Sequence, residues 1–259
     1  MARGAGALGW LAAALIALTL APVAAVALRA GGGVMEFSAT DVASLRFTVL
    51  QAALSALLAV GLAVPVARAL ARRRFPGRGL MVTALGAPFL LPVIVAILGL
   101  LSVFGRSGWL AQGLALIGLS PPSIYGLQGV VLSHVFFNLP LAVRLILAGW
   151  QAIPAERVRL ASALDLGPGP VFWHLEVPML REVIPGALLL IFTLCLSSFA
   201  IALTMGGGPA ATTVELAIYQ ALRFDFDLSA AARLALVQVA ICGLAFAAAS
   251  RLTLAAGFG

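Results

Sequence analysis

Long apolar runs without a charged residue alternate along this chain with short segments that carry most of its arginines. The charge-free runs cover residues 4–28, 47–67, 79–105, 107–143, 183–214 and 234–250. About 20 apolar residues suffice to cross a ~30 Å hydrocarbon core. Because backbone amides in lipid must be satisfied within their own segment, these runs predict helices. We expect an all-α polytopic membrane protein of about six transmembrane helices, placed near 8–28, 45–70, 80–104, 126–149, 183–205 and 229–252.

Two of the runs need interpretation. The first, with Arg3 ahead of it, has the pattern of a cleaved signal peptide, but its length favours a retained first helix. The fourth is too long for one helix. Its Gly-rich part, Gly108 to Gly118, stands ahead of Pro121 and Pro122 and predicts a short interfacial helix or a re-entrant turn.

Composition supports a membrane protein. The chain is 63% hydrophobic and 10% charged, with a mean hydropathy of +1.13, whereas a soluble domain is about 25% charged. All 16 basic residues are arginine and the net charge is +7. The arginines end the apolar runs, where guanidinium groups reach lipid phosphates, and they form no aromatic-interleaved basic face. We therefore expect contact with membrane lipid and no nucleic-acid partner. Cys195 and Cys242 lie in apolar runs without metal-ligand spacing, and neither metal nor cofactor is predicted.

Orientation follows from the arginine-rich connections. Five arginines lie between the second and third predicted helices, and three lie between the fourth and fifth: Arg68, Arg72, Arg73, Arg74, Arg78, Arg157, Arg159 and Arg181. The positive-inside rule makes these connections cytoplasmic and both termini cytoplasmic. Segments 29–44, 105–125 and 206–228 then face outward. We divide the chain into 1–40, the first transmembrane helix and a periplasmic loop, and 41–256, the main transmembrane domain.

The inner connection 151–182 is long for an all-membrane protein. Pro154 stands where a helix can begin, and Val158, Ala161 and Leu164 recur at helical spacing. The Gly-Pro-Gly-Pro run at 167–170 is expected to stop that helix. A second short apolar-aromatic helix follows and ends at Pro178. Two angled short helices would form a rigid knob suited to a groove on a soluble partner.

This connection resembles the cytoplasmic loop of type I ABC importer permeases, whose pattern is Glu-Ala-Ala, three residues, Gly, nine residues, Ile-x-Leu-Pro. Aligned on the last proline, the pattern falls on the following residues: Arg159 at the glutamate, Ala161 at the second alanine, Asp165 at the glycine, and Leu175, Val177 and Pro178 at the end. A glycine, Gly167, comes two residues later. The resemblance implies a coupling loop at 151–182 that docks on a dimer of ATPase subunits.

A narrower resemblance covers almost the whole chain. The runs 71–78, 134–140, 192–200 and 206–228, the last opening with Gly-Gly-Gly-Pro, are similar to the first half of thiamine permeases, and the first two also to ferric-iron permeases. Those permeases carry two homologous six-helix halves, so a second half or a second copy is implied. The resemblance implies import of thiamine or its phosphate esters across the bacterial inner membrane, with a periplasmic binding protein. Ferric iron is the alternative cargo.

Other features leave alternatives open. Gly206, Gly207, Gly208 and Pro209 form either a gate loop at the outer end of the fifth helix or a plain turn. The acidic residues Glu215, Asp225 and Asp227 form a docking surface, attract a cationic substrate, or are simply solvated.

No Walker-type Gly-x-x-x-x-Gly-Lys run is present, nor any lysine, so ATP hydrolysis is expected in a partner and no residue is predicted to be catalytic. An ion-coupled carrier would need carboxylates deep in the membrane, and no acidic residue falls centrally in a predicted span. A membrane scaffold without transport is the third alternative.

Overall fold

The structure is a computed structural model that describes residues 2–30, 37–121 and 123–256. Within these ranges the chain forms helices and no strand. The elements, in chain order, are α1 Ala2–Arg29, α2 Ala39–Arg72, α3 Arg78–Ala84, η1 Ala87–Phe89, α4 Val93–Phe104, α5 Trp109–Leu116, α6 Leu127–Gln151, α7 Ala155–Ala163, α8 Pro168–Val171, η2 Phe172–Glu176, α9 Val177–Leu196, α10 Phe199–Met205, η3 Pro209–Ala211, α11 Val214–Arg223 and α12 Leu228–Ala256.

Five helical segments of the described chain are long and apolar enough to cross a membrane: Ala39–Arg72, Val93–Leu116, Leu127–Gln151, Pro168–Leu196 and Leu228–Ala248. They confirm an all-helical multi-pass membrane fold. The predicted helix at 8–28 lies in α1, where the apolar stretch found, Ile16–Arg29, is shorter. That first span stays a prediction.

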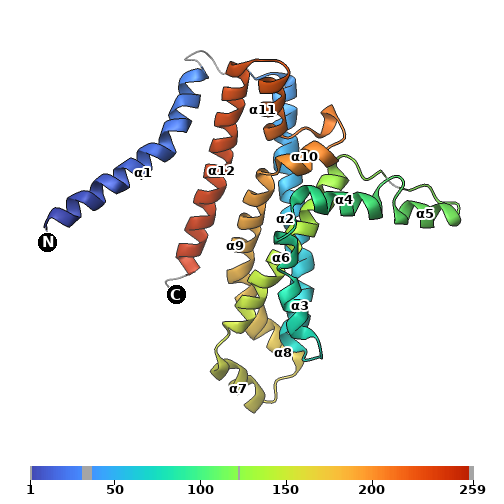
Figure 1. Cartoon of the computed structure of the whole chain (residues 1–259). Coiled ribbons are helices and arrows are strands. Elements are labelled where there is room, and N and C mark those ends of the chain that lie inside the picture. The colour runs from blue at the N-terminus through green and yellow to red at the C-terminus, as the bar shows by residue number, and fades with distance from the viewer. Residues whose placement is uncertain (1, 31–36, 122, 257–259) are drawn as a thin grey trace.

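The predicted continuous helix at 80–104 is wrong. The chain breaks there into α3, the 3₁₀ turn η1 and α4. Pro88 lies in η1 and Pro92 precedes α4, and a proline both lacks an N–H donor and disfavours helical backbone in the residue before it. Figure 1 shows α4 and α5 running sideways from the bundle at mid-height. The Gly-rich part expected to be a short helix forms α5.

The core lies between α2, α6 and α9. The face of α2 that meets α6 is built from alanines, among them Ala52, Ala59 and Ala63, each fully buried. Small residues let helix backbones approach closely, which is how helices associate where the solvent is lipid. Ile146 of α6 and Ile191 of α9, also fully buried, close the same cluster.

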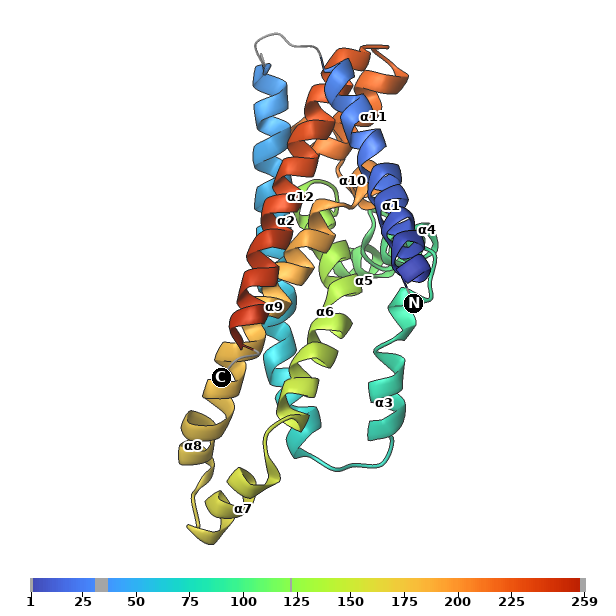
Figure 2. The same ribbon diagram turned by 90° about the vertical axis from the view of Figure 1, so that its left-hand side faces the viewer.

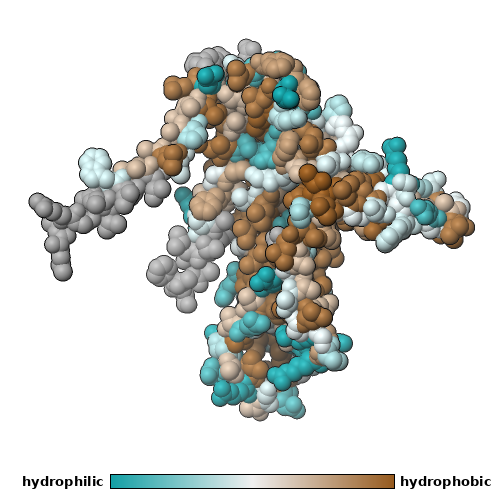
Figure 3. All heavy atoms as spheres, viewed as in Figure 1, coloured by the Kyte–Doolittle hydropathy of each residue, from teal (hydrophilic) through white to brown (hydrophobic). Residues whose placement is uncertain are grey.

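The molecule has two distinct ends. At one end lie the turn between α2 and α3, α7 and α8, and at the other lie α11 and the start of α2 (Figures 1 and 2). Hydrophilic side chains gather around α7 and α8, whereas apolar ones cover the middle of the face seen in Figure 3. The arginine-rich segments predicted to share one side of the membrane therefore share one end of the fold.

Candidate functional site

The helix predicted after Pro154 is present as α7, with Pro154 at its N-cap. Its C-terminal turn closes through two backbone hydrogen bonds, from Leu166 N–H to Ala161 O (3.0 Å) and from Asp165 N–H to Ser162 O (3.1 Å). Asp165 has φ of 48°. This left-handed position after a helix is usually taken by glycine, and aspartate is one of the few other residues that tolerate it. Asp165 therefore makes a left-handed turn at the position where the family pattern has glycine.

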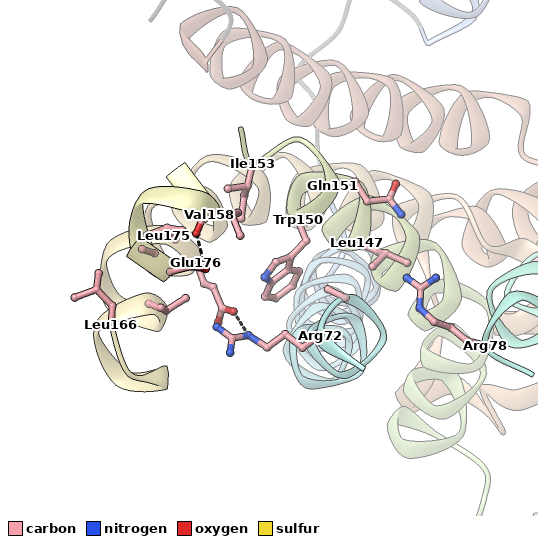
Figure 4. A pocket seen from close by; sticks show the side chains of 14 residues that line it. Arg72, Arg78, Leu147, Trp150, Gln151, Ile153, Val158, Leu166, Leu175 and Glu176 are labelled. Carbon is pink, nitrogen blue, oxygen red and sulfur yellow. Dashed lines mark hydrogen bonds and ion pairs between the residues drawn. The ribbon is translucent and has the colours of Figure 1, made fainter. Parts of the chain in front are cut away.

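The structure brings only some of the predicted loop residues together. Ala161 and Leu175 line a cavity of about 480 Å³ between α7, η2 and the ends of α2 and α6 (Figure 4). Val177 is half-buried, whereas Arg159, Asp165, Gly167 and Pro178 are exposed. Gly167 has an ordinary extended backbone (φ −62°, ψ 172°) at the N-cap of α8, so the turn does not depend on it.

An ion-pair cluster that sequence reasoning missed closes this cavity. Glu176 is 3% exposed, and its carboxylate accepts hydrogen bonds from Arg68 Nε, at 2.8 Å, and from Arg72 Nε. The Arg68 guanidinium also stacks over the Phe172 ring, 4.9 Å from its centroid. The sequence shows only a carboxylate inside an apolar-aromatic run and, 108 and 104 residues before it, two arginines spaced four residues apart. It does not show that they meet. The cluster ties the loop to the end of α2.

We predicted a second separate helix in the loop, ending at Pro178. The structure shows instead that this segment continues into α9. The helix α7 ends at Ala163, before the Gly-Pro-Gly-Pro run that was expected to stop it, and Pro168 of that run begins α8. From there the π-helical turn η2 leads directly into α9, with Pro178 inside its first turn. Proline is tolerated there because the first helical N–H groups need no intrahelical acceptor. A single helical segment, Pro168–Leu196, therefore connects the loop with the membrane interior.

The predicted gate residues form a close turn after α10. Gly207 and Gly208 have φ of +75° and +134°, and a Cβ on Gly207 would lie 2.8 Å from the Tyr125 Cβ. A backbone hydrogen bond from Gly126 N–H to Met205 O (2.8 Å) holds the turn against the start of α6. Gly207, Gly208 and Pro209 line a second cavity of about 840 Å³ among α2, α11 and α12.

Buried polar side chains join α2, α6, α9 and α12 between these two ends. Gln51 Nε2 donates to Cys195 O, and Gln238 Nε2 donates to Leu196 O, each at 2.9 Å. Ser55 Oγ and His134 Nδ1 lie 3.3 Å apart. Gln51 and His134 are at most 2% exposed. Hydropathy alone could not find them, because a single Gln or His hardly changes the mean of an apolar run.

Comparison with known proteins shows which proteins resemble this sequence. The chain matches no model of a known protein family. It is 46% identical over 241 residues to the "Thiamine transport system permease protein ThiP" of Brucella abortus (strain 2308), covering 90% of this chain and 44% of that protein. With ThiP of Escherichia coli (strain K12) the identity is 52% over 198 residues, 76% of this chain and 37% of that one. The chain thus spans less than half the length of these relatives.

A shorter relative matches over most of both lengths. The "Molybdenum transport system permease protein ModB" of Mycobacterium bovis is 31% identical over 205 residues, 78% of this chain and 75% of ModB. This chain belongs to the type I ABC importer permease family. The fold of the family agrees with a solved structure of a bacterial alginate ABC transporter, at a TM-score of 0.77 and 15% identity over 94% of both chains. The permease fold and its multi-pass membrane location follow.

Proposed function

We propose that this chain is a permease subunit, or half-permease, that moves thiamine or its phosphate esters across the bacterial inner membrane. ATP hydrolysis by a partner subunit drives the movement, and the chain itself is not an enzyme. The observation that carries the proposal is the 46% identity over 90% of this chain to ThiP, a protein named for thiamine transport. A match over 90% of this chain supports the same transport mechanism as well as the same fold.

The end formed by α7 is the proposed seat of the ATPase dimer. Leu160 of α7 and Leu164, the C-cap residue of that helix, are 60% and 62% exposed at the same end as the arginines. Exposed leucines on a helix at the polar end of a membrane protein favour a protein partner. In this proposal Arg159, Ala161, Asp165 and Gly167 belong to the docking helix and its turn. Leu175, Val177 and Pro178 carry its movement into α9.

The segment 206–209 is the proposed gate at the opposite end. Its left-handed glycines and its contact with Tyr125 link the end of α10 to the start of α6. A movement of α9 that displaced α10 would therefore open or close this turn. The cavity that these glycines line is the proposed entrance for cargo from a periplasmic binding protein.

The proposed topology places the α7 end and both termini in the cytoplasm, as the arginine distribution favours. Residues 1–40 form an added helix and periplasmic loop beside the transport domain 41–256, and α1 packs mainly against α12. A second six-helix unit, either another chain or another copy, completes the path. Alternating access then arises between the two units.

The test is uptake of radiolabelled thiamine at nanomolar concentration in source cells with and without the gene, with ferric-iron uptake in parallel. Loss of thiamine uptake, restored by the gene, is the expected result. Loss of iron uptake alone would replace thiamine by iron as the cargo. Loss of neither would overturn the proposed function.

A pair of variants tests the docking face in the same cells. Leu160→Glu puts a charge on the exposed face of α7 and is expected to abolish uptake and remove the ATPase from the purified complex. Phe75→Glu is the matched control, since Phe75 is 42% exposed at the same end but outside α7. Equal loss in both variants would argue against α7 as the docking helix.

A further inference from the structure

The helix α9 stops inside the bundle and restarts as α10 after two residues with non-helical backbone, Ser197 and Ser198. The carbonyls freed at this break have dedicated partners. Cys195 O accepts from Gln51 and from Ser198 Oγ (3.2 Å), and Leu196 O accepts from Gln238. Because two buried glutamines from different helices hold it, the break is a fixed feature of the fold. In transporters, interrupted helices of this kind line binding sites.

Glu215 lies at this break although it belongs to another helix. The buried Thr48 Oγ1 accepts a hydrogen bond from Val214 N–H (2.9 Å), which fixes the start of α11 against α2. This anchor directs the Glu215 carboxylate to the backbone of Ser198 and Phe199 and to the Ser197 side chain. Glu215 is half-buried, and these groups hold its carboxylate at the break.

The depth of the break makes a lipid-facing role costly. Ser197 follows Arg181 by 16 residues of helix, a rise of about 24 Å, whereas the hydrocarbon core is ~30 Å thick. On the proposed topology the break lies in the outer half of the membrane. A carboxylate at this depth faces protein or a water-filled path rather than lipid. The position of Glu215 is therefore compatible with a place on the transport path.

Aromatic rings continue from the carboxylate. Tyr219 lies one helical turn after Glu215 on the same face of α11. Its ring is 5.1 Å from that of Phe199 and 5.9 Å from that of Phe224, measured between centroids. Tyr219 is 36% exposed, so part of this face is open to a ligand. A carboxylate beside aromatic faces suits a flat organic cation, which gains both ion pairing and cation–π contact.

We propose that Glu215, Phe199 and Tyr219 form a binding site for an aromatic organic cation on the transport path, at the break between α9 and α10. This inference rests on the proposed function, because thiamine combines a permanently cationic thiazolium ring with an aminopyrimidine ring. The inference also distinguishes between the two cargoes named in the proposed function, free thiamine and its phosphate esters. A phosphate ester brings negative charge toward Glu215, so the site favours free thiamine over thiamine pyrophosphate.

The test is ligand protection of a cysteine at the break, in the complex purified with its own partner subunits. Ser197→Cys places a thiol beside Glu215, and its maleimide labelling is measured as the increment over the parent chain. Thiamine is expected to slow labelling, and thiamine pyrophosphate at equal concentration to slow it less. Adding Glu215→Gln should raise the protective thiamine concentration roughly tenfold, which corresponds to about 1.4 kcal/mol. Ser102→Cys, at an exposed site on α4, is the control that thiamine should not protect.

Further outcomes separate this inference from the proposed function. Glu182→Gln removes an exposed carboxylate near the opposite end of α9 and should leave protection unchanged. Protection that survives Glu215→Gln, or equals that by the pyrophosphate, would overturn the site while thiamine uptake by wild-type cells still supported the function. Loss of the partner permease from the Glu215→Gln complex would instead assign Glu215 to the interface and overturn the site. Protection by thiamine without thiamine uptake would support the site and overturn the function.

Discussion

Replacing Glu176 by glutamine removes the carboxylate that pairs the 151–182 loop with Arg68 and Arg72 of α2. The side chain keeps its size and one acceptor oxygen, but neither Arg68 nor Arg72 retains an ionic partner in the cluster. Breaking a fully buried ion pair costs about 3–5 kcal/mol, whereas an exposed pair contributes about 0.2–1 kcal/mol. Here the carboxylate is 3% exposed and the arginines are 39% and 36% exposed, so both guanidinium groups can turn toward water.

We therefore expect an intermediate loss of about 1–3 kcal/mol for Glu176→Gln, between the exposed and buried limits. Because the lost contact joins α2 to the segment proposed to carry motion into α9, transport should fall more than protein level. The measurements are thermal stability of the purified complex and thiamine uptake per ATP hydrolysed. We expect ATP hydrolysis to continue while uptake per ATP drops.

Glu182→Gln is the matched control, since Glu182 is an exposed carboxylate on the same helix six residues later. It should change neither stability nor uptake. Lysine at both 68 and 72 keeps the charge but not the guanidinium contacts, so it should fall between wild type and Glu176→Gln. Identical stability and uptake in Glu176→Gln and Glu182→Gln would refute the role of the cluster.

Three further substitutions test local geometry. Asp165→Gly should retain uptake because glycine favours the left-handed turn, whereas Asp165→Val should destabilise that turn by about 1–2 kcal/mol and reduce retention of the ATPase on purification. Gly207→Ala should lower thermal stability by about 1–3 kcal/mol, because the new Cβ would meet Tyr125 and the backbone φ is +75°; an unchanged melting temperature would contradict this turn. Thr48→Val should cost about 1–3 kcal/mol, because it leaves the buried N–H of Val214 without an acceptor, and protease protection of α11 would report the loss.

The sequence predicted those parts of the fold that depend on local patterns. The runs near 45–70, 126–149 and 229–252 became α2, α6 and α12, since hydropathy and length suffice to define a continuous span. Pro154 and the apolar spacing after it located α7. The break within 80–104 was missed, although Pro88 and Pro92 lie at it. Two prolines hardly change the mean hydropathy of so apolar a run.

Contacts between distant residues could not be predicted in the same way. Glu176 meets arginines 108 and 104 residues away, and Gln51 meets Cys195 across 144 residues. Their pairing depends on which helices become neighbours, and one sequence read by itself does not specify this. The turn at Asp165 could not be located from the sequence for a different reason: glycine is the usual left-handed residue, and the left-handed conformation of Asp165 is seen only in its backbone angles.

The contact of α1 with α12 has a consequence for biosynthesis. Ala25, Val26 and Arg29 of α1 lie beside Leu228 and Ala231 of α12. Synthesis runs at about 5–20 residues per second, so roughly 200 residues separate the emergence of these two helices by on the order of 10–40 s. On the proposed topology, the nascent α1 would reside in the bilayer throughout that interval, before its main neighbour exists. Its apolar sequence must therefore be compatible with lipid alone, and the native α1–α12 contact can form only as translation of α12 proceeds.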